Sequence, residues 1–297
     1  MSKSQLYKLT CNLLCCLSLS ATAEASTTTY LAPNWQASNF LTLSTPSRAI
    51  EFDSELNLYI EEKSDDGSGT IIIEKLDAAS GYTSSPPFFA YDTGYYGATS
   101  LDFDGSGNLY VAERGHAGND GIIRKIDTSN YSMTDIRSFD NQRPTGIDAL
   151  NDGTVLYTGR RESDPAFGNV YEIDTSGNRT VLIPDIVGTG IAMDQSGRLF
   201  ISTPDRDDLA LAGSSIYMYE TSDTDFSNPI LIATFDSALG VEELTFDDFG
   251  NLYMIDNISN TQIVRLSQVP LPAAVWLFLG GFFSLLGLAR QRSKQIA

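Results

Sequence analysis

Three carboxylates occupy the same place in successive copies of a repeated sequence phrase, namely Glu51, Asp102 and Asp148. If the copies are arranged around a common axis, these side chains converge, and converging carboxylates repel one another unless a proton or a hard cation relieves the repulsion. Carboxylate oxygens are ligands that Ca²⁺ prefers in proteins. The pattern therefore predicts either a Ca²⁺ site or the solvated lining of a central channel, and no other cofactor is expected.

A second group of polar residues lies where loops are expected, at the ends of the apolar runs. Loops carry polar side chains whether or not they bind a ligand, so a solvated rim is the alternative interpretation. Within this group, Glu243, Asp256 and Asn257 would supply the acidic and amide ligands of a metal-dependent hydrolase. The equivalent loops of other copies have Arg114, Arg160 and Asp205 instead. The residues that we assign to a possible ligand face are Glu113, Arg114, Arg160, Arg206, Glu243, Asp256 and Asn257, of which the last three are that metal set.

The composition excludes several kinds of site. Residues 26 to 268 carry 37 of the 38 acidic and 14 of the 19 basic side chains, and such a negative surface repels phosphate backbones, so we expect no nucleic-acid partner. All three cysteines, Cys11, Cys15 and Cys16, lie near the N-terminus. Disulfides, zinc-thiolate sites and cysteine nucleophiles are therefore not expected in the rest of the chain.

The elements that would position these residues recur five times. In each copy, two short apolar runs flank a turn of the Asp-x-x-Gly-Asn kind, as in 101–112, and the second run carries an aromatic residue. Glycine supplies the positive φ of such a turn and aspartate accepts its backbone hydrogen bonds, so each copy predicts a β-hairpin. The aromatic residues are Tyr59, Tyr110, Tyr157, Phe200 and Tyr253.

A third and a weaker fourth apolar run follow each hairpin, except that the fifth copy has no fourth run. Four strands at a period of 40 to 50 residues are typical of a propeller blade. The run Asn39–Leu43 has no blade of its own. We expect it to complete the last blade and close the ring, which leaves no long sheet edge exposed. The prediction is an all-β propeller over residues 26–268, with five blades, or six as the alternative.

The hairpin phrase 101–112 resembles the NHL and gluconolactonase-like propeller repeats. The resemblance implies the propeller fold, and because that superfamily includes binding scaffolds, lactonases and proteins without known activity, it implies no particular activity.

Residues 1–25 are typical of a secretory signal peptide. Lys3 and Lys8 precede a mildly apolar run, and Ala23 and Ala25 offer small-residue cleavage positions. A lipoprotein anchor at Cys15 or Cys16 is the alternative, but leucines stand before them where small residues are required.

The composition changes abruptly at Val269. The stretch 273–289 has no charged residue, and Arg290 follows it directly. As a helix its 17 residues would measure roughly 26 Å, just enough to span a bilayer. The basic residues Arg290, Arg292 and Lys294 would stay on the cytoplasmic side and leave the acidic body outside.

The tail 269–297 closely resembles the PEP-CTERM sorting signals in their VPLPA variant. The residues that carry the resemblance are Val269, Pro270, Leu271, Pro272 and Ala273, with Trp276 in the apolar stretch and the basic tail. The family implies an exosortase-like membrane protease as partner, which cuts near the motif and passes the body to the cell surface or the extracellular matrix. A permanent membrane anchor is the alternative.

Together these features predict an exported propeller that binds a ligand, for example an extracellular polysaccharide, or has a structural role. A non-enzymatic module is the preferred interpretation, and a metal-dependent, lactonase-type hydrolase is the alternative.

Overall fold

The computed structural model describes residues 28–62, 70–83, 87–92, 97–114, 120–161, 167–204, 214–220, 226–235, 240–256 and 261–269. The expected signal peptide, transmembrane helix and basic tail lie outside these residues. Within them, no helix is long and apolar enough to cross a membrane.

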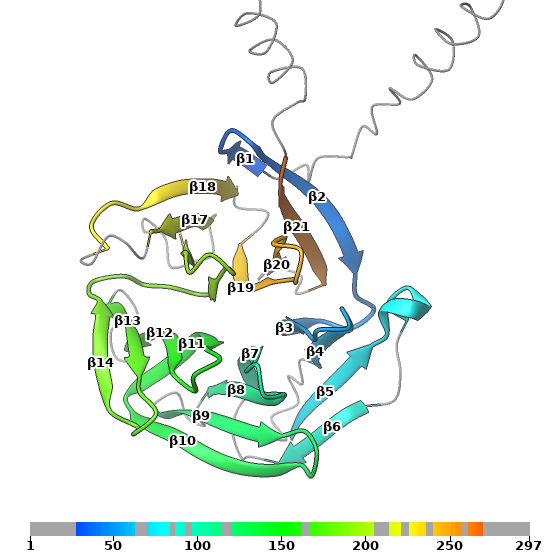
Figure 1. The fold of residues 1–297 in the computed structure, drawn as a ribbon, viewed down its shortest axis with the longest axis vertical. Coiled ribbons are helices and arrows are strands. Elements are labelled where there is room, and N and C mark those ends of the chain that lie inside the picture. Colours follow the sequence, from blue (N-terminus) through cyan, green and yellow to red (C-terminus); the bar gives the residue numbers. More distant parts are fainter. Residues whose placement is uncertain are drawn as a thin grey trace, which may run out of the picture.

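Five antiparallel sheets are arranged around a central axis, as Figure 1 shows. The first three blades each contain four consecutive strands. Blade 1 contains β3 (Ser47–Phe52), β4 (Leu58–Glu62), β5 (Thr70–Leu76) and β6 (Pro87–Asp92), with the 3-10 turn η1 (Ala78–Ser80) between the last two. Blade 2 contains β7 (Ala98–Phe103), β8 (Asn108–Arg114), β9 (Asp120–Asp127) and β10 (Ser132–Asp140). Blade 3 contains β11 (Gln142–Ala149), β12 (Val155–Arg161), β13 (Gly168–Ile173) and β14 (Arg179–Ile183).

The last two blades take strands from the N-terminal part of the chain. Blade 4 contains β15 (Ile191–Met193), β16 (Leu199–Pro204), β17 (Ser214–Tyr219), β18 (Ile230–Phe235) and, on its outer edge, β1 (Thr28–Leu31). Blade 5 contains β19 (Val241–Phe246), β20 (Leu252–Asp256), β21 (Gln262–Gln268) and β2 (Trp35–Thr42). The five-bladed prediction is confirmed, and the six-bladed alternative is not.

The ring is closed by β2, which pairs antiparallel with β21 from Trp35–Gln268 to Thr42–Gln262. The predicted closing strand is therefore confirmed, although it begins at Trp35 rather than Asn39. The short strand β1 was not predicted. It pairs with β18, so the N-terminal segment contributes to two neighbouring blades.

The core lies between the blades. Its buried side chains form five clusters, and each cluster draws on two neighbouring blades, so every interface around the ring has one. The interface between blades 5 and 1 includes Phe40 of β2, whose ring lies 4.9 Å from that of Tyr253 and 6.0 Å from that of Phe52. Burial of apolar surface at every interface favours the closed ring over an open stack.

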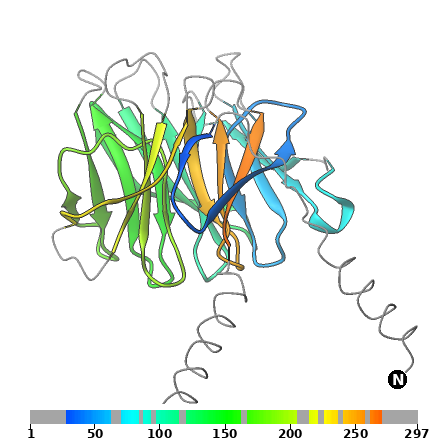
Figure 2. The same ribbon diagram turned by 90° about the horizontal axis from the view of Figure 1, so that it is seen from above.

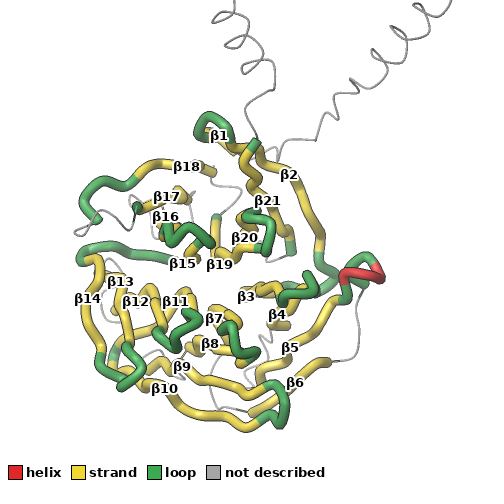
Figure 3. The backbone as a smooth tube through the Cα atoms, viewed as in Figure 1, coloured by secondary structure: helices red, strands yellow, loops and turns green. Residues whose placement is uncertain are grey.

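The strands stand roughly along the ring axis, as Figure 2 shows. The innermost strands β3, β7, β11, β15 and β19 all run in the same direction along it. We call the face where they end, at 53–57, 104–108, 150–154, 194–198 and 247–251, the turn face. The other face is the loop face. Figure 3 shows the hairpin turns as loop segments near the centre of the ring.

Four of the five hairpin turns have the predicted aspartate, and three of these four also have the predicted glycine. Asp104 Oδ1 accepts from the backbone N–H groups of Ser106 and Asn108, both at 2.9 Å, and Gly107 has a φ of 80°. The turn that follows β3 has the same hydrogen bonds, but Leu56 takes the place of glycine at a φ of 64°. The departure is the turn after β11, where Leu150 stands in place of the aspartate.

Candidate functional site

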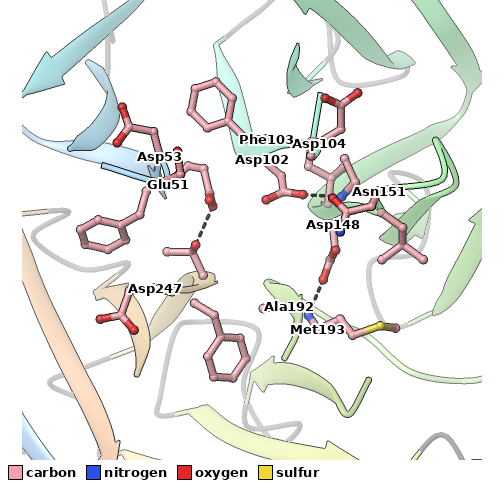
Figure 4. A pocket seen from close by; sticks show the side chains of 18 of the residues that line it. Glu51, Asp53, Asp102, Phe103, Asp104, Asp148, Asn151, Ala192, Met193 and Asp247 are labelled. Carbon is pink, nitrogen blue, oxygen red and sulfur yellow. Dashed lines mark hydrogen bonds between the residues drawn. The ribbon is translucent and has the colours of Figure 1, made fainter. Parts of the chain in front are cut away.

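The innermost strands bring Glu51, Asp102 and Asp148 together near the turn face. They come from β3, β7 and β11, and Figure 4 shows their side chains pointing into a common cavity. Ala192 and Thr245 take the same position on β15 and β19. Glu51 is buried, whereas Asp102 and Asp148 remain partly exposed to the cavity. The three carboxylates thus line the channel, as the sequence periodicity predicts.

Each of these carboxylates holds its blade to another by a hydrogen bond. Asp102 Oδ2 accepts from the backbone N–H of Ala149 in blade 3, and Asp148 Oδ2 accepts from that of Met193 in blade 4. The hydroxyl of Thr245 in blade 5 donates to Glu51 Oε2 at 2.5 Å. The ring of acids therefore contributes to the assembly of the propeller.

Their pKa values are raised, chiefly by burial. Burial raises the pKa of Glu51 to about 8, with a further increase from the charge of Asp148. Burial likewise raises the pKa of Asp148 to about 7. For Asp102, burial and the charges of Glu51 and Asp148 hold the pKa well above its usual value. The group therefore retains protons near neutral pH, which relieves part of the repulsion.

The three carboxylates do not form the predicted Ca²⁺ site. One oxygen of each is engaged in an inter-blade hydrogen bond. In the part of the chain that the structure describes, no group of three or more acidic, histidine or cysteine side chains is spaced to hold a metal ion. Ca²⁺ needs six to eight oxygen ligands at 2.3 to 2.6 Å, so this donor set does not fit it.

The cavity has a volume of about 770 Å³ and opens at the turn face. Its floor contains the three carboxylates, and its rim contains the turn residues Asp53, Asp104, Asp194 and Asp247. Its walls include aromatic side chains, which the sequence analysis did not assign to a site. They are Phe52, Tyr59, Phe88, Phe103 and Phe246. A cavity of this size and mixed character is typical of a small-molecule site.

Glu243 crosses the channel on the loop-face side of this cavity and is not one of the residues that line it. Its side chain leaves β19 and accepts a hydrogen bond from Ser100 of β7, 2.8 Å away, so it crosses from blade 5 to blade 2. Ser100 Oγ in turn accepts from the backbone N–H of Ile147 in blade 3 at 2.8 Å. Glu243 is fully buried, and its Oε2 has no hydrogen-bond partner among the described residues.

Small residues at the equivalent positions make room for this crossing. Ala49, Gly146 and Gly190 occupy the place that Glu243 holds in blade 5. A Cβ on Gly190 would lie 2.7 Å from the backbone nitrogen of Leu244, so only glycine allows the neighbouring strands to approach this closely. The sequence signal for this crossing is that Glu243 is large, whereas Ala49, Gly146 and Gly190 are small at the aligned positions of other copies.

The predicted ligand face lies at the other end of the strands. Glu113 is buried in an ion pair with Arg124 at 2.8 Å and accepts from the hydroxyl of Tyr91 at 3.0 Å. Asp256 is buried too, and its Oδ2 accepts from the backbone N–H of Gln262 at 3.1 Å.

In the part of the chain that the structure describes, the remaining residues of that face do not form one site. Arg114 and Arg160 lie near the ends of β8 and β12, and Glu243 is the crossing residue described above. Arg206 and Asn257 lie outside the described residues, so the metal set Glu243, Asp256 and Asn257 stays a prediction. The cavity was missed because the hairpin turns were assigned only a structural role.

Comparisons with known proteins show the fold. No family model matches the chain, and no curated protein matches it. Among solved structures, a chain of a nidogen/laminin complex is 15% identical with a TM-score of 0.51, over 76% of this chain and 78% of that one. A Bacteroides thetaiotaomicron protein of unknown function is 13% identical with a TM-score of 0.52, over 75% of this chain and 60% of that one.

A putative gluconolactonase is also similar, at 13% identity and a TM-score of 0.48, over 80% of this chain and 93% of the other. The first two likenesses show a shared overall fold, which in this chain is the five-bladed propeller described above. At these low sequence identities, a shared fold does not imply a shared activity or ligand.

Proposed function

We propose that the chain is an exported protein, carried by an exosortase-type sorting system, whose propeller acts as a non-enzymatic binding module at the cell surface or in the extracellular matrix. The observation that supports the binding role is the 770 Å³ cavity at the turn face, with carboxylates on its floor and aromatic side chains on its walls. The floor acids are already committed to inter-blade hydrogen bonds, which favours a preformed receptor over a set of reacting groups.

The end of the last strand is consistent with a separate sorting tail. Gln268 ends β21, and the backbone N–H of Val269 donates to the carbonyl of Asn34 at 2.7 Å. The pairing of β21 with β2 is thus complete where the Val269–Ala273 motif begins. A protease that cuts near this motif would release the propeller with all of its strands.

This proposal gives the precursor two partners. The apolar stretch 273–289 would hold it in the inner membrane with the acidic body outside, and an exosortase-like membrane protease would recognise the motif. After cleavage, the body would meet extracellular polymers, of which a polysaccharide is one candidate ligand. Aromatic side chains of the kind found in the cavity wall can pack against sugar rings through their apolar faces.

The mass of the mature protein tests the sorting step. Mass spectrometry of the protein from culture medium and from membranes should give an N-terminus near Ala25 and a C-terminus near Pro272. A full-length, membrane-bound product after the signal peptide is removed would instead establish a permanent anchor and overturn the sorting proposal.

Retention by the extracellular polymer tests the binding role. The mature protein should co-sediment with polymer from the producing cells, and Phe103→Leu in the cavity wall should reduce the retained fraction several-fold. The matched control is Phe167→Leu, because Phe167 is exposed and lies outside the cavity lining. Equal retention of the two variants would contradict binding in this cavity.

A further inference from the structure

The lining of the cavity carries charge of one sign. Eight of its residues are acidic, and none of the lining residues is lysine, arginine or histidine. Three of the acids on the rim have basic partners just behind the turns. Lys75 Nζ lies 3.2 Å from Asp53, Lys125 Nζ lies 3.6 Å from Asp104, and Arg198 lies 2.5 Å from Asp194. The rim charge is therefore largely compensated.

The acids of the floor have no basic partner among the described residues, and the protons that they retain near neutral pH are the positive charge that a bound cation would displace. Within the described residues, Glu51, Asp102 and Asp148 accept from backbone N–H groups and a hydroxyl, not from a basic side chain. The charged groups that act on Asp102 are other acids, namely Glu51, Asp148 and Glu243. The floor of the cavity is thus a place where positive charge would be stabilised.

Glu243 gives an independent indication. It lies behind the three floor acids and crosses the channel from blade 5 to blade 2. Its side chain is completely buried, yet Oε2 has no hydrogen-bond partner among the described residues. A buried carboxylate oxygen without a donor is costly, and a proton or a cation near the floor would reduce that cost.

The apolar walls of the cavity favour an organic cation over a metal ion. A metal ion gains nothing from apolar walls, and the floor acids are not spaced to hold one. Phe52, Phe103 and Phe246 line the cavity beside the floor acids and offer apolar surface to the body of an organic molecule. Aromatic faces also attract ammonium groups.

We propose that this cavity binds an organic cation, a protonated primary amine carried on an apolar body, with the ammonium group at Asp102 and Asp148 and the body against the aromatic walls. An ammonium group donates three hydrogen bonds. One oxygen of each aspartate holds the adjacent blade, and Asp102 also shares a side-chain hydrogen bond with Glu51. An ammonium group would donate to the second oxygen of Asp148 and take the place of the proton between Asp102 and Glu51. The inference rests on the proposed binding function and names its ligand class.

Three isosteric probes test the class of ligand by isothermal titration at pH 7 and low salt, with the full chain in mild detergent. The probes are 3-phenylpropylamine, 3-phenylpropanol and 3-phenylpropionate. We expect the amine to bind at least about ten-fold more tightly than the alcohol, and the acid to bind more weakly than both, because charged hydrogen bonds are worth more than neutral ones. High salt should weaken only the amine.

Two variants assign the binding to the floor. Asp102→Asn and Asp148→Asn should each weaken the amine about ten-fold and leave the affinity of the alcohol unchanged, because asparagine retains an oxygen for the inter-blade hydrogen bond. The matched control is Asp185→Asn, an exposed residue outside the cavity lining at a φ of 57°, which asparagine tolerates. Circular dichroism establishes that each variant is folded.

The outcomes separate this inference from the proposed function. Equal affinity for amine and alcohol, or undiminished amine binding by the folded Asp102→Asn/Asp148→Asn double variant, would overturn the cation proposal. So would a failure of the amine to bind at all. Retention of the protein by extracellular polymer that depends on Phe103 would still support the binding module in those cases. Loss of retention together with tight, floor-dependent amine binding would overturn the polymer-binding role alone.

Discussion

The hydroxyl of Ser100 donates to Oε1 of Glu243 across the channel, at 2.8 Å, and thereby joins two blades that are not neighbours in the ring. The same hydroxyl oxygen accepts from the backbone N–H of Ile147. Since both residues are fully buried, this bridge is a part of the core in which polar groups take the place of apolar packing. Its loss would leave a buried carboxylate oxygen and a buried N–H without partners.

Ser100→Ala should therefore be strongly destabilising for so small a change. We expect the free energy of unfolding to fall by about 2 to 4 kcal/mol, measured by urea denaturation at pH 6, because two buried groups lose their hydrogen bonds. The control is Ser129→Ala, which removes an exposed hydroxyl that donates to Asp127 at 2.6 Å. It should cost less than about 1 kcal/mol. Similar losses in the two variants would contradict the bridge.

The stability of the propeller should decrease from about pH 5 to about pH 9. The pKa of Glu51 is about 8 in the folded protein against an ordinary value of 4.5, because burial disfavours its charged form. Between these values the folded state holds a proton that the unfolded state has lost, so the free energy of unfolding decreases as pH rises.

Asp148, with a pKa raised to about 7, contributes in the same direction. Together the effect should amount to a few kcal/mol, by order of magnitude. Glu51→Gln should reduce the slope of unfolding free energy against pH, as measured by denaturation at pH 5, 7 and 9. A stability that rises over this range would contradict the raised pKa values.

Two acids share Arg124 and provide a matched pair. Arg124 lies 2.8 Å from both Glu113 and Asp135, but the Glu113 side chain is fully buried whereas that of Asp135 is 60% exposed. We expect Glu113→Gln to cost about 3 kcal/mol, because it leaves a largely buried guanidinium without its main counter-charge. Asp135→Asn should cost less than about 1 kcal/mol, because water screens an exposed pair. Thermal unfolding of the two variants compares them directly.

The repeat explains how much of this molecule the sequence predicts. The alternation of apolar residues in each copy predicts the strands, and the unmatched run at Phe40 predicts the closure, because a ring with an open blade would expose a sheet edge. Position within the repeat also brings Glu51, Asp102 and Asp148 to one channel. The strands and the position of the channel acids follow from the sequence of each copy alone. The closure follows from the one apolar run that belongs to no copy.

The remaining features depend on how different copies meet. The crossing of Glu243 to Ser100 depends on two residues that share an aligned position in non-adjacent blades, so neither copy alone predicts it. The strand β1 has no place in the repeat at all. The cavity takes lining residues from all five blades, and it was missed because the hairpin turns were assigned only a structural role.

Gly107 and Leu56 allow a test of the turn conformation. Both residues hold the same turn position with φ values of 80° and 64°, and a Cβ on Gly107 would meet no atom within 4 Å. Gly107→Ala should therefore cost about 1 to 2 kcal/mol through backbone strain alone. Leu56→Gly should relieve such strain and be neutral or stabilising by up to about 1 kcal/mol, as measured by urea denaturation. Equal destabilisation by both changes would contradict this account.

The two N-terminal strands should differ in importance when they are deleted. Removal of 26–31 takes away β1, which only extends the outer edge of blade 4, so the protein should still unfold cooperatively with its melting temperature lowered by a few degrees. Removal of 26–43 also takes away β2, exposes the edge of β21 and removes Phe40 from its place between Phe52 and Tyr253. That protein should lose its cooperative transition and associate through the open edge.

Circular dichroism melting and gel filtration distinguish the two deletions, and a point variant checks that the longer one fails for the stated reason. Ala37 of β2 is 2% exposed and packs in the cluster between blades 4 and 5. Ala37→Asp should therefore destabilise the ring by several kcal/mol, because it buries a charge without a partner. A monomeric, cooperatively folded product of the longer deletion would show that the ring does not depend on the pairing of its two chain ends.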